Sequence, residues 1–341
     1  MTPIHTGRRR LLAGSGAALA VAALGGLDRP TWTGRQFHNQ PVDSHLHPFL
    51  VNLWAEVARR TNGRLVVTVF AQNDQIPGSD PAALELLRQG GLQFFALMGG
   101  ILSKAVPAAD IQGLPYAFKT HAQVHAVNDG ALGAYLGREC AAKGIHRFQY
   151  GLMENGFRQV GMIDQPIRTA EDLSGRRIRV PDGEMFRDTF AALGATPVTV
   201  NINGLYDALK TRRVDGQENP LVVTEFNRLY EVTHNQSLTN HMWSGFNLIA
   251  NLGFWNALPA DVQRIVDAAV KRHVARQRAF TDSLNRRLQT TLAQRGQIFN
   301  AAEPASFRER LGADFYRRWR AQLGETGWTL LEKQVGRLGP V

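Results

Sequence analysis

The chain offers little material for covalent cross-links or membrane spans. Cys140 is the only cysteine among 341 residues, so no disulfide can form within the chain even in an oxidising compartment. Beyond the first 26 residues, no apolar run is long enough to cross a bilayer. Internal repeats and low-complexity linkers are also lacking. About three hundred residues therefore remain for one large domain or for two lobes with a core each.

Acidic residues are in the minority. The sequence has 39 Lys and Arg against 29 Asp and Glu, a formal net charge of +10. The basic residues are scattered among acidic ones, and no nucleic-acid-binding motif is present. We therefore expect no nucleic-acid partner, and we interpret the excess charge as a source of solubility and of mild attraction for anions.

Catalytic motifs are missing as well, with one partial exception. No nucleophile–base pair and no P-loop can be identified, so we predict neither an enzyme nor a cofactor. The segment Asp43-Ser-His45-Leu-His47 resembles the start of a metal-dependent amidohydrolase, because two histidines two residues apart on a strand can both bind zinc. Such an enzyme is an eight-stranded βα barrel with further ligands at later strand ends. The other histidines are poorly placed for that, so we predict no metal and keep this enzyme as a distant alternative.

The amino-terminal residues predict export. Arg8, Arg9 and Arg10 precede an Ala/Gly/Leu run that ends near Gly26, and this hydrophobic region is too short to span a bilayer comfortably. Paired arginines before a weakly hydrophobic, glycine-containing segment are typical of the twin-arginine route. We predict a signal peptide over residues 1–26 and a periplasmic mature protein, with an uncleaved anchor as the alternative.

The next segment predicts alternating strands and helices. Apolar runs predict strands over residues 35–39, 65–70 and 93–97, and helical spacing predicts helices over 49–61 and 80–87. This alternation favours a mostly parallel sheet wrapped by helices. The loops after the strands should meet at one edge of the sheet, where ligands bind. Candidates for lining a cleft there are Asn39, His45, His47, Gln75 and Met98.

The second half of the chain repeats this pattern and adds a long helix. A strand over residues 147–153 is interrupted at 154–156 and is followed by extended chain, which indicates passage from one lobe to another. Further strands are expected around Arg179, over 196–201 and entering 215–216, with helices over 184–193 and 203–211. Apolar residues at helical spacing then predict one long helix over 261–295.

Arg179 is the most informative single residue. Strand residues alternate between faces, so Ile178 and Val180 share one face and Arg179 takes the other. Pro181 ends the strand, because proline donates no ladder hydrogen bond. An arginine at the carboxyl end of a strand is well placed to bind an anion, and its planar fork matches a carboxylate. The alternative is a structural arginine paired with an acid such as Glu218.

Five short segments occur in a fixed order along the chain. They are Asn155-Gly-Phe-Arg158, Thr169-x-Glu-Asp-Leu-x-Gly-x-x-Ile-Arg179-Val-Pro181, Leu193-Gly-Ala-Thr-Pro197, Tyr206-x-Ala-Leu209 and Val214-Asp-Gly-Gln-Glu-Asn219-Pro220. Together they resemble the DctP family, the extracytoplasmic solute-binding proteins of tripartite ATP-independent periplasmic (TRAP) transporters. The resemblance runs from about residue 35 to 296, nearly the whole mature chain.

The resemblance implies a fold and a function. The fold is α/β, a two-lobed periplasmic binding protein in which each lobe is a mixed, mostly parallel sheet flanked by helices and a long helix spans both lobes. The lobes would cover residues 27–154, with return segments from the C-terminal half, and 155–255, and the long helix and the C-terminal helices, over 256–341, would pack on both. The implied function is capture of a small organic acid and its delivery to the integral membrane subunits of a TRAP transporter. An ABC-type or sensory periplasmic binding protein is the alternative.

The resemblance also assigns site residues. Arg179 matches the arginine that clamps the ligand carboxylate, Arg158 a second arginine, and Asn219 the amide that contacts the same carboxylate. Glu154 is a candidate for binding a ligand hydroxyl or for orienting Arg158. The ligand itself stays open between a dicarboxylate, a sugar acid, a keto acid and an aromatic acid, as does the question of whether a metal ion bridges it.

Two further positions are candidates for the edge of the pocket. Trp243 lies in a Met-Trp-Ser-Gly-Phe run, where it would either stack on a ligand ring or pack in the core. Asn203 and Gly204 stand where the family usually carries Ser-Glu. The loss of that glutamate changes the pocket or the hinge, so the ligands of better-known members are not transferred to this chain.

Overall fold

The computed structural model describes residues 32–339, and the predicted signal peptide over 1–26 lies outside them. Within the described residues, nine strands form one sheet in the order β2-β1-β3-β8-β4-β7-β5-β6, with β9 paired to β8. The strands are β1 Trp32–His38, β2 Leu65–Phe70, β3 Phe94–Met98, β4 Ile145–Met162, β5 Arg177–Val180, β6 Thr196–Thr199, β7 Gly216–Asn219, β8 Asn235–Asn251 and β9 Ile298–Ala301.

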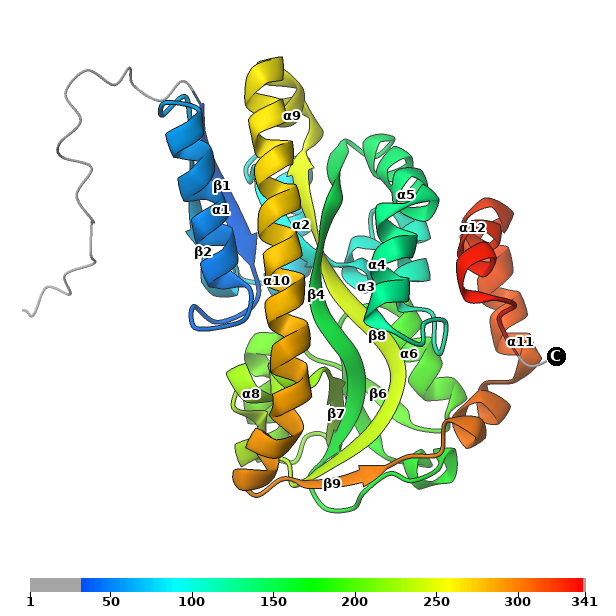
Figure 1. Ribbon diagram of the computed structural model, residues 1–341. Coiled ribbons are helices and arrows are strands. Elements are labelled where there is room, and N and C mark those ends of the chain that lie inside the picture. Colours follow the sequence, from blue (N-terminus) through cyan, green and yellow to red (C-terminus); the bar gives the residue numbers. More distant parts are fainter. Residues whose placement is uncertain (1–31, 340–341) are drawn as a thin grey trace, which may run out of the picture.

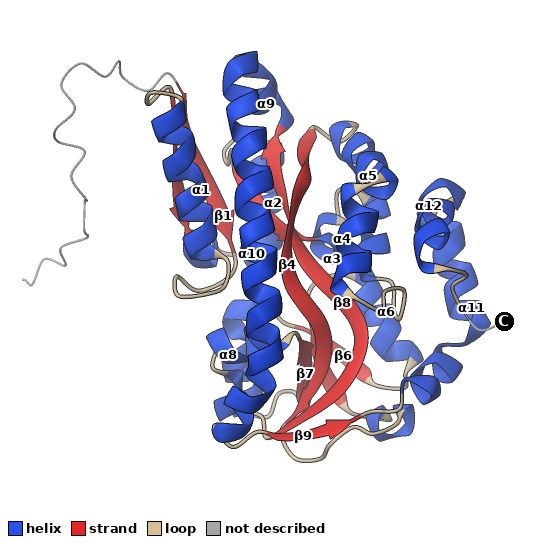
Figure 2. Cartoon of the chain, in the orientation of Figure 1, coloured by secondary structure: helices blue, strands red, loops and turns tan. Residues whose placement is uncertain are grey.

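Helices flank this sheet along its length (Figure 2). They are α1 His47–Arg60, α2 Ser79–Arg88, α3 Gly99–Leu102, α4 His121–Asp129, α5 Ala131–Ala141, α6 Glu184–Ala192, α7 Leu205–Lys210, α8 Leu221–Phe226, α9 Leu252–Ala257, α10 Ala260–Gln294, α11 Pro304–Leu323 and α12 Glu325–Val335. The predicted strands and helices up to residue 295 are present within a few residues of their expected bounds.

The first three strands are parallel, as the strand–helix alternation predicts. β1 pairs with β2 on one side and with β3 on the other. β3 is buried at all five positions because it has strand neighbours on both edges and helices on both faces. Its second neighbour, β8, is antiparallel to it. The sheet is therefore open and mixed, which makes the eight-stranded parallel barrel of an amidohydrolase wrong for this chain.

Two long strands cross the whole molecule. β4 and β8 run antiparallel from the pair Ile145 and Asn251 to the pair Met162 and Asn235, and Figure 1 shows them side by side. The predicted interruption at residues 154–156 is wrong, because these residues form a register shift within β4 and not a break. Gly156 fits this position through its φ of 136°, and a Cβ there would lie 2.9 Å from Asn285 of α10.

The long helix α10 joins separate hydrophobic cores. Val266 and Val270 pack with the first three strands and α1. Leu288 and Leu292, near the other end, pack in a different core with α7 and α8. The predicted helix over 261–295 is thereby confirmed, and Figure 1 shows it running beside β4 through both halves.

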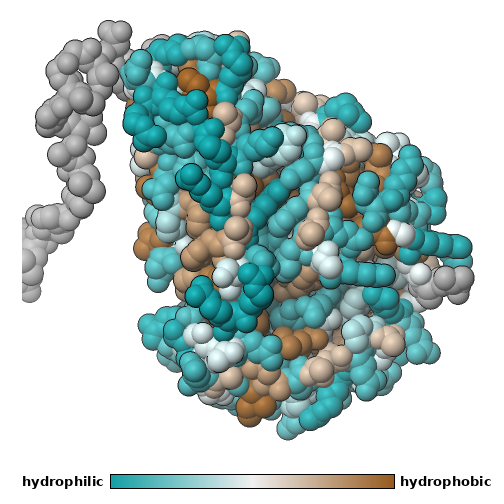
Figure 3. Space-filling model, in the orientation of Figure 1, coloured by the Kyte–Doolittle hydropathy of each residue, from teal (hydrophilic) through white to brown (hydrophobic). Residues whose placement is uncertain are grey.

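The helices after β9 cover one side of the molecule. Phe307 and Trp319 of α11 and Trp328 of α12 enter a core that also contains Leu136 of α5 and Phe190 of α6. Figure 3 shows a mainly hydrophilic face with small, scattered apolar patches. Across residues 32–339, none of the helices combines the length and the apolar character that a membrane span requires.

Candidate functional site

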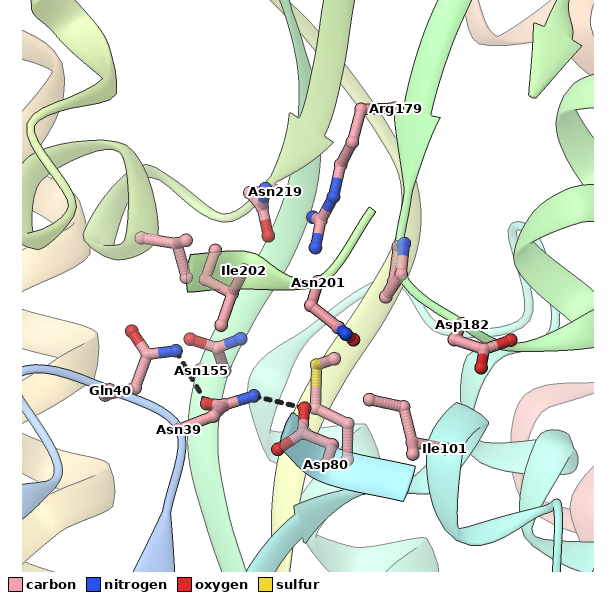
Figure 4. Close-up of a pocket in the computed structure, with 13 residues that line it drawn as sticks. Asn39, Gln40, Asp80, Ile101, Asn155, Arg179, Asp182, Asn201, Ile202 and Asn219 are labelled. Atoms are coloured by element: carbon pink, nitrogen blue, oxygen red, sulfur yellow. Dashed lines mark hydrogen bonds between the residues drawn. The ribbon is translucent and has the colours of Figure 1, made fainter. Parts of the chain in front are cut away.

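The carboxyl ends of five strands converge on one narrow pocket (Figure 4). Most of its residues lie in or shortly after β1, β3, β5, β6 and β7, where open α/β sheets bind ligands, and Asp80 of α2 and Asn155 of β4 also line it. The cavity of the pocket is small, about 20 Å³, which is close to the room that one water molecule needs. The lining includes Asn39, Gln40, Asp80 and Met98 from the first half of the chain, and Asn155, Arg179, Asn201 and Asn219 from the second.

Arg179 supplies the pocket with a positive charge. Its side chain is buried, and Nε donates to the carbonyl of Val200 at 2.7 Å. Among residues 32–339, no hydrogen bond or ion pair uses the two terminal nitrogens of Arg179, which point into the pocket beside Asn219 in Figure 4. Burial lowers the pKa of Arg179 to about 10, partly offset by the charge of Glu218. The guanidinium is therefore charged at neutral pH, with hydrogen-bond donors to spare.

Arg158 lies outside the lining and is occupied by protein partners. It is fully buried, with Nε and Nη2 both donating to the Glu218 carboxylate. Nη1 donates to Ser244 Oγ at 3.0 Å, and Nη2 also donates to Asn219 Oδ1 at 3.2 Å. Burial alone would raise the pKa of Glu218, but the charge of Arg158 holds it below its usual value. The pair is a structural ion pair that orients Asn219, and Glu218 belongs to Arg158 and not to Arg179.

Asp80 faces Arg179 from the opposite side of the pocket. Its carboxylate accepts hydrogen bonds from Asn39 Nδ2 at 2.7 Å and from Asn73 Nδ2 at 2.6 Å. Burial raises the pKa of Asp80, and the two amides and the charge of Arg179 oppose this rise. An aspartate followed by proline at the start of the predicted helix over 80–87 would favour Asp80 as its cap, but α2 has no side-chain cap hydrogen bond.

An unusual turn holds Asn73 against Asp80. Residues 72–75 all have φ between 50° and 54°, a left-handed conformation that costs roughly 1–2 kcal/mol per residue. Gln75 lies in this turn, exposed, and donates to Gln72 Oε1 at 3.0 Å. It does not line the pocket. Strain of this kind is often found beside functional sites.

Glu154 and Trp243 meet in a second polar cluster, outside the pocket lining. Trp243 Nε1 donates to Glu154 Oε1 at 2.7 Å, while Nδ1 of His121 and Nε2 of His125 lie 3.0 and 2.8 Å from Oε2. Burial would raise the pKa of Glu154, but the two histidines bring it to about 2. Gln277 of α10 also hydrogen-bonds the backbone N–H and C=O of Glu154. The cluster thus connects the paired strands β4 and β8 with α4 and α10, near the middle of the two long strands.

Replacing His121 with alanine is expected to destabilise the protein more at acidic than at alkaline pH. Burial lowers the pKa of His121, but the hydrogen bond and charge of Glu154 raise it above 6.5 overall. Its contribution is therefore complete below pH 6.5 and is lost as pH rises through the folded-state pKa. We expect a loss of about 1.5 kcal/mol at pH 5.5 and a smaller loss at pH 9, measured by urea unfolding. Equal losses at both pH values would contradict this account.

The remaining predicted residues lie away from the pocket or at its margin. His47 begins α1, and its Nδ1 is 2.8 Å from His38 Nε2. His45 is buried and stacks on Phe226. Asn203 is exposed, directly after the lining residue Ile202. Within the described part of the chain, no group of three or more His, Cys, Asp or Glu side chains is arranged to hold a metal ion.

The structure thus brings three of the nine predicted site residues, Arg179, Asn219 and Met98, into the pocket lining, together with Asn39 from the wider set. Sequence reasoning missed Asp80, Asn155 and Asn201. Asn201 comes shortly after β6, where the rule that ligands bind at strand ends applies, whereas Asp80 lies in α2, well after the end of β2. Asn155 lies in the middle of β4, where no local signal indicates which way it points.

Comparison with known proteins identifies one matching family model and several related proteins. The family model of bacterial extracellular solute-binding protein, family 7 (DctP), matches residues 37–321. The C4-dicarboxylate-binding periplasmic protein DctP of Rhodobacter capsulatus is 32% identical over 214 residues, 62% of this chain and 62% of that protein. An uncharacterized protein, y4mM, of Sinorhizobium fredii is 33% identical over 265 residues, 77% of this chain and 48% of that protein. The matched region thus spans about half to two thirds of these relatives.

Solved structures match along nearly the whole chain. A TRAP periplasmic solute-binding protein of Sulfitobacter sp. NAS-14.1, with bound β-D-galacturonate, has a TM-score of 0.84 and 26% identity, covering 90% of this chain and 100% of that one. A homologue from Roseobacter denitrificans, with bound β-D-glucuronate, has a TM-score of 0.84 and 25% identity, covering 89% and 100%. The two-lobed fold with its long helix is therefore shared with these proteins. The chain belongs to the DctP family of bacterial extracellular solute-binding proteins.

Proposed function

We propose that this protein captures a small organic carboxylate in the pocket between its lobes and delivers it to the membrane subunits of a TRAP-type transporter. The observation that carries the proposal is Arg179, a buried cation whose terminal nitrogens have no acceptor among the described residues. A buried charge is costly unless it is paired. A ligand carboxylate would supply the missing acceptors, in a bidentate arrangement.

The relatives support this class of ligand. The Rhodobacter capsulatus relative is named for C4-dicarboxylates, and the Sulfitobacter structure holds a uronate. Both ligands are carboxylates, although their other groups differ. Family membership favours a binding role over a catalytic one. Family membership also favours a TRAP transporter over the ABC-type or sensory alternative, and it favours a location outside the cytoplasm. The paired arginines in residues 1–26 suggest that the protein is exported by the twin-arginine route.

The site residues take different roles in this proposal. Arg179 and Asn219 bind the carboxylate, and Met98 packs against the ligand. Arg158 holds Asn219 in place through its 3.2 Å hydrogen bond and does not touch the ligand. Glu154 and Trp243 hold the paired strands β4 and β8 together through their hydrogen bond. In this proposal the lobes cover residues 27–154 and 155–255, and a C-terminal region covers 256–341. The lobes are connected by β4, β8 and α10, and they close about these connections.

A thermal-shift screen tests the proposal. The chain from residue 27 onwards is expected to be stabilised by a subset of small carboxylates, by roughly 2.7 kcal/mol when the acid is present at a hundred times its dissociation constant. D-galactose serves as the uncharged control for D-galacturonate, because the two differ only at the carboxylate carbon. If no acid stabilises the protein, or if D-galactose stabilises it as much as D-galacturonate does, the carboxylate assignment is overturned.

A further inference from the structure

Some of the charges in and behind the pocket lining are neutralised within the protein. The lining carboxylate of Asp182 lies 3.0 Å from Lys104 Nζ and 3.1 Å from Arg187 Nη1. Arg158 is paired with Glu218 behind the lining. Among the described residues, Arg179 and Asp80 are the two charged lining groups without an ion-pair partner. They face the pocket from opposite sides in Figure 4, and no ion pair joins them.

Hydrogen-bond acceptors collect at the end of the pocket away from Arg179. Asp80 is only 4% exposed and accepts from the amides of Asn39 and Asn73. An ionised carboxylate has about four acceptor positions, so it can accept more. Asn155 Oδ1 is a second acceptor. It is buried, and no hydrogen bond of good geometry reaches it within residues 32–339 although the His45 ring is its neighbour, while its Nδ2 donates to Ser244 Oγ at 3.2 Å.

We propose that the ligand is a monocarboxylate whose far end donates hydrogen bonds, through hydroxyl or ammonium groups, to Asp80, and that Asp80 excludes dicarboxylates. This inference rests on the proposed function, since it takes the first carboxylate to lie at Arg179. It decides between ligand classes that the sequence leaves open.

The exclusion follows from charge and from hydrogen-bond type. A second ligand carboxylate at this end would place two like charges together in a buried site, which is unfavourable. It would also bring further acceptors to Asp80 and Asn155, so that neither receives a donor. A hydroxyl or an ammonium group brings the donors that both residues can accept. Asp80 thus acts against one class of ligand while it binds another, as specificity often requires.

Matched pairs of acids test the inference without any variant. D-gluconate and D-glucarate differ at one end, hydroxymethyl against carboxylate, and so do 4-hydroxybutyrate and succinate. By titration calorimetry at pH 7, we expect the monocarboxylate of at least one pair to bind at least tenfold more tightly than its dicarboxylate. 4-Aminobutyrate carries an ammonium group where 4-hydroxybutyrate carries a hydroxyl, so the affinities of these two acids show which kind of donor the site prefers. A dicarboxylate that binds as tightly as its partner, or more tightly, would overturn the inference.

A substitution then assigns the selectivity to Asp80. Asp80→Asn keeps the shape and removes the charge, and we expect it to reduce the preference for the monocarboxylate roughly tenfold. Asp74→Asn is the control, because Asp74 lies nearby, in the left-handed turn that precedes α2, but is exposed. An unchanged preference in Asp80→Asn would contradict the role of Asp80. If no acid binds the unsubstituted protein, including D-galacturonate, the proposed function itself fails, so the two failures are distinguishable.

Discussion

Replacing Arg179 with alanine is expected to lower the affinity for a bound carboxylate at least a hundredfold. In the proposed complex, the guanidinium and the ligand carboxylate would form a buried, hydrogen-bonded pair, and removal of one partner of such a pair costs on the order of 3–5 kcal/mol. A hundredfold change in dissociation constant corresponds to about 2.7 kcal/mol. Titration calorimetry with the acid identified by the thermal-shift screen measures the effect directly.

Two further variants show whether the effect comes from this guanidinium. Arg177→Ala removes an arginine two residues earlier on β5, where the side chain is 46% exposed and pairs with Asp215. We expect its affinity to equal that of the unsubstituted protein. Arg179→Lys keeps the charge but loses the planar fork, so an intermediate affinity is expected. Wild-type affinity in Arg179→Ala would exclude Arg179 as the carboxylate clamp.

The sequence predicts well those features that depend on local periodicity. The helix over 261–295 has apolar residues at regular spacing, and the observed α10 begins and ends within one residue of those bounds. The direction of Arg179 follows from strand alternation and from Pro181, and the structure places Arg179 in the pocket. Asn219, which the resemblance to the DctP family assigns from the segment 214–220, also lies in the pocket, at the end of β7 beside β5. In these cases one short segment contains all the information.

Features that depend on distant partners are not predictable in this way. The sequence makes Arg158 and Glu154 candidates for ligand contact, and both lie on β4, which the sequence predicts to be interrupted at Glu-Asn-Gly. The partner of Arg158 is 60 residues away on β7, and the histidines that bind Glu154 come from α4. Only the paired register of β4 with β7 and β8 shows which way these side chains point.

Asp80 illustrates a different difficulty, a local signal with more than one meaning. A polar loop followed by Ser-Asp-Pro is typical of a helix start, because Asp caps helices and proline favours the first turn. The helix does begin there, at Ser79. The carboxylate of Asp80 nevertheless turns away from the helix, because Asn39, 41 residues earlier, and the left-handed turn with Asn73 provide its donors.

Glu218→Gln is expected to cause the largest loss of stability, because it leaves the Arg158 charge buried without its partner. Both side chains are fully buried, and breaking such a pair costs about 3–5 kcal/mol. Glutamine preserves the shape, so the loss reports charge and not a cavity. Urea unfolding at pH 7 should show a lower midpoint with an unchanged slope. A loss below about 1 kcal/mol would mean that Arg158 finds other compensation, for instance from Asn219.

Removing both charges separates the stability of the pair from its role in binding. A buried ion pair can often be replaced by apolar side chains of similar volume with little loss. We therefore expect Arg158→Met combined with Glu218→Leu to recover most of the stability lost in Glu218→Gln. Carboxylate affinity of this double variant should nevertheless be lower than that of the unsubstituted protein, because Asn219 Oδ1 no longer receives its hydrogen bond from Arg158. Affinity that recovers together with stability would show that Arg158 does not position Asn219 for the ligand.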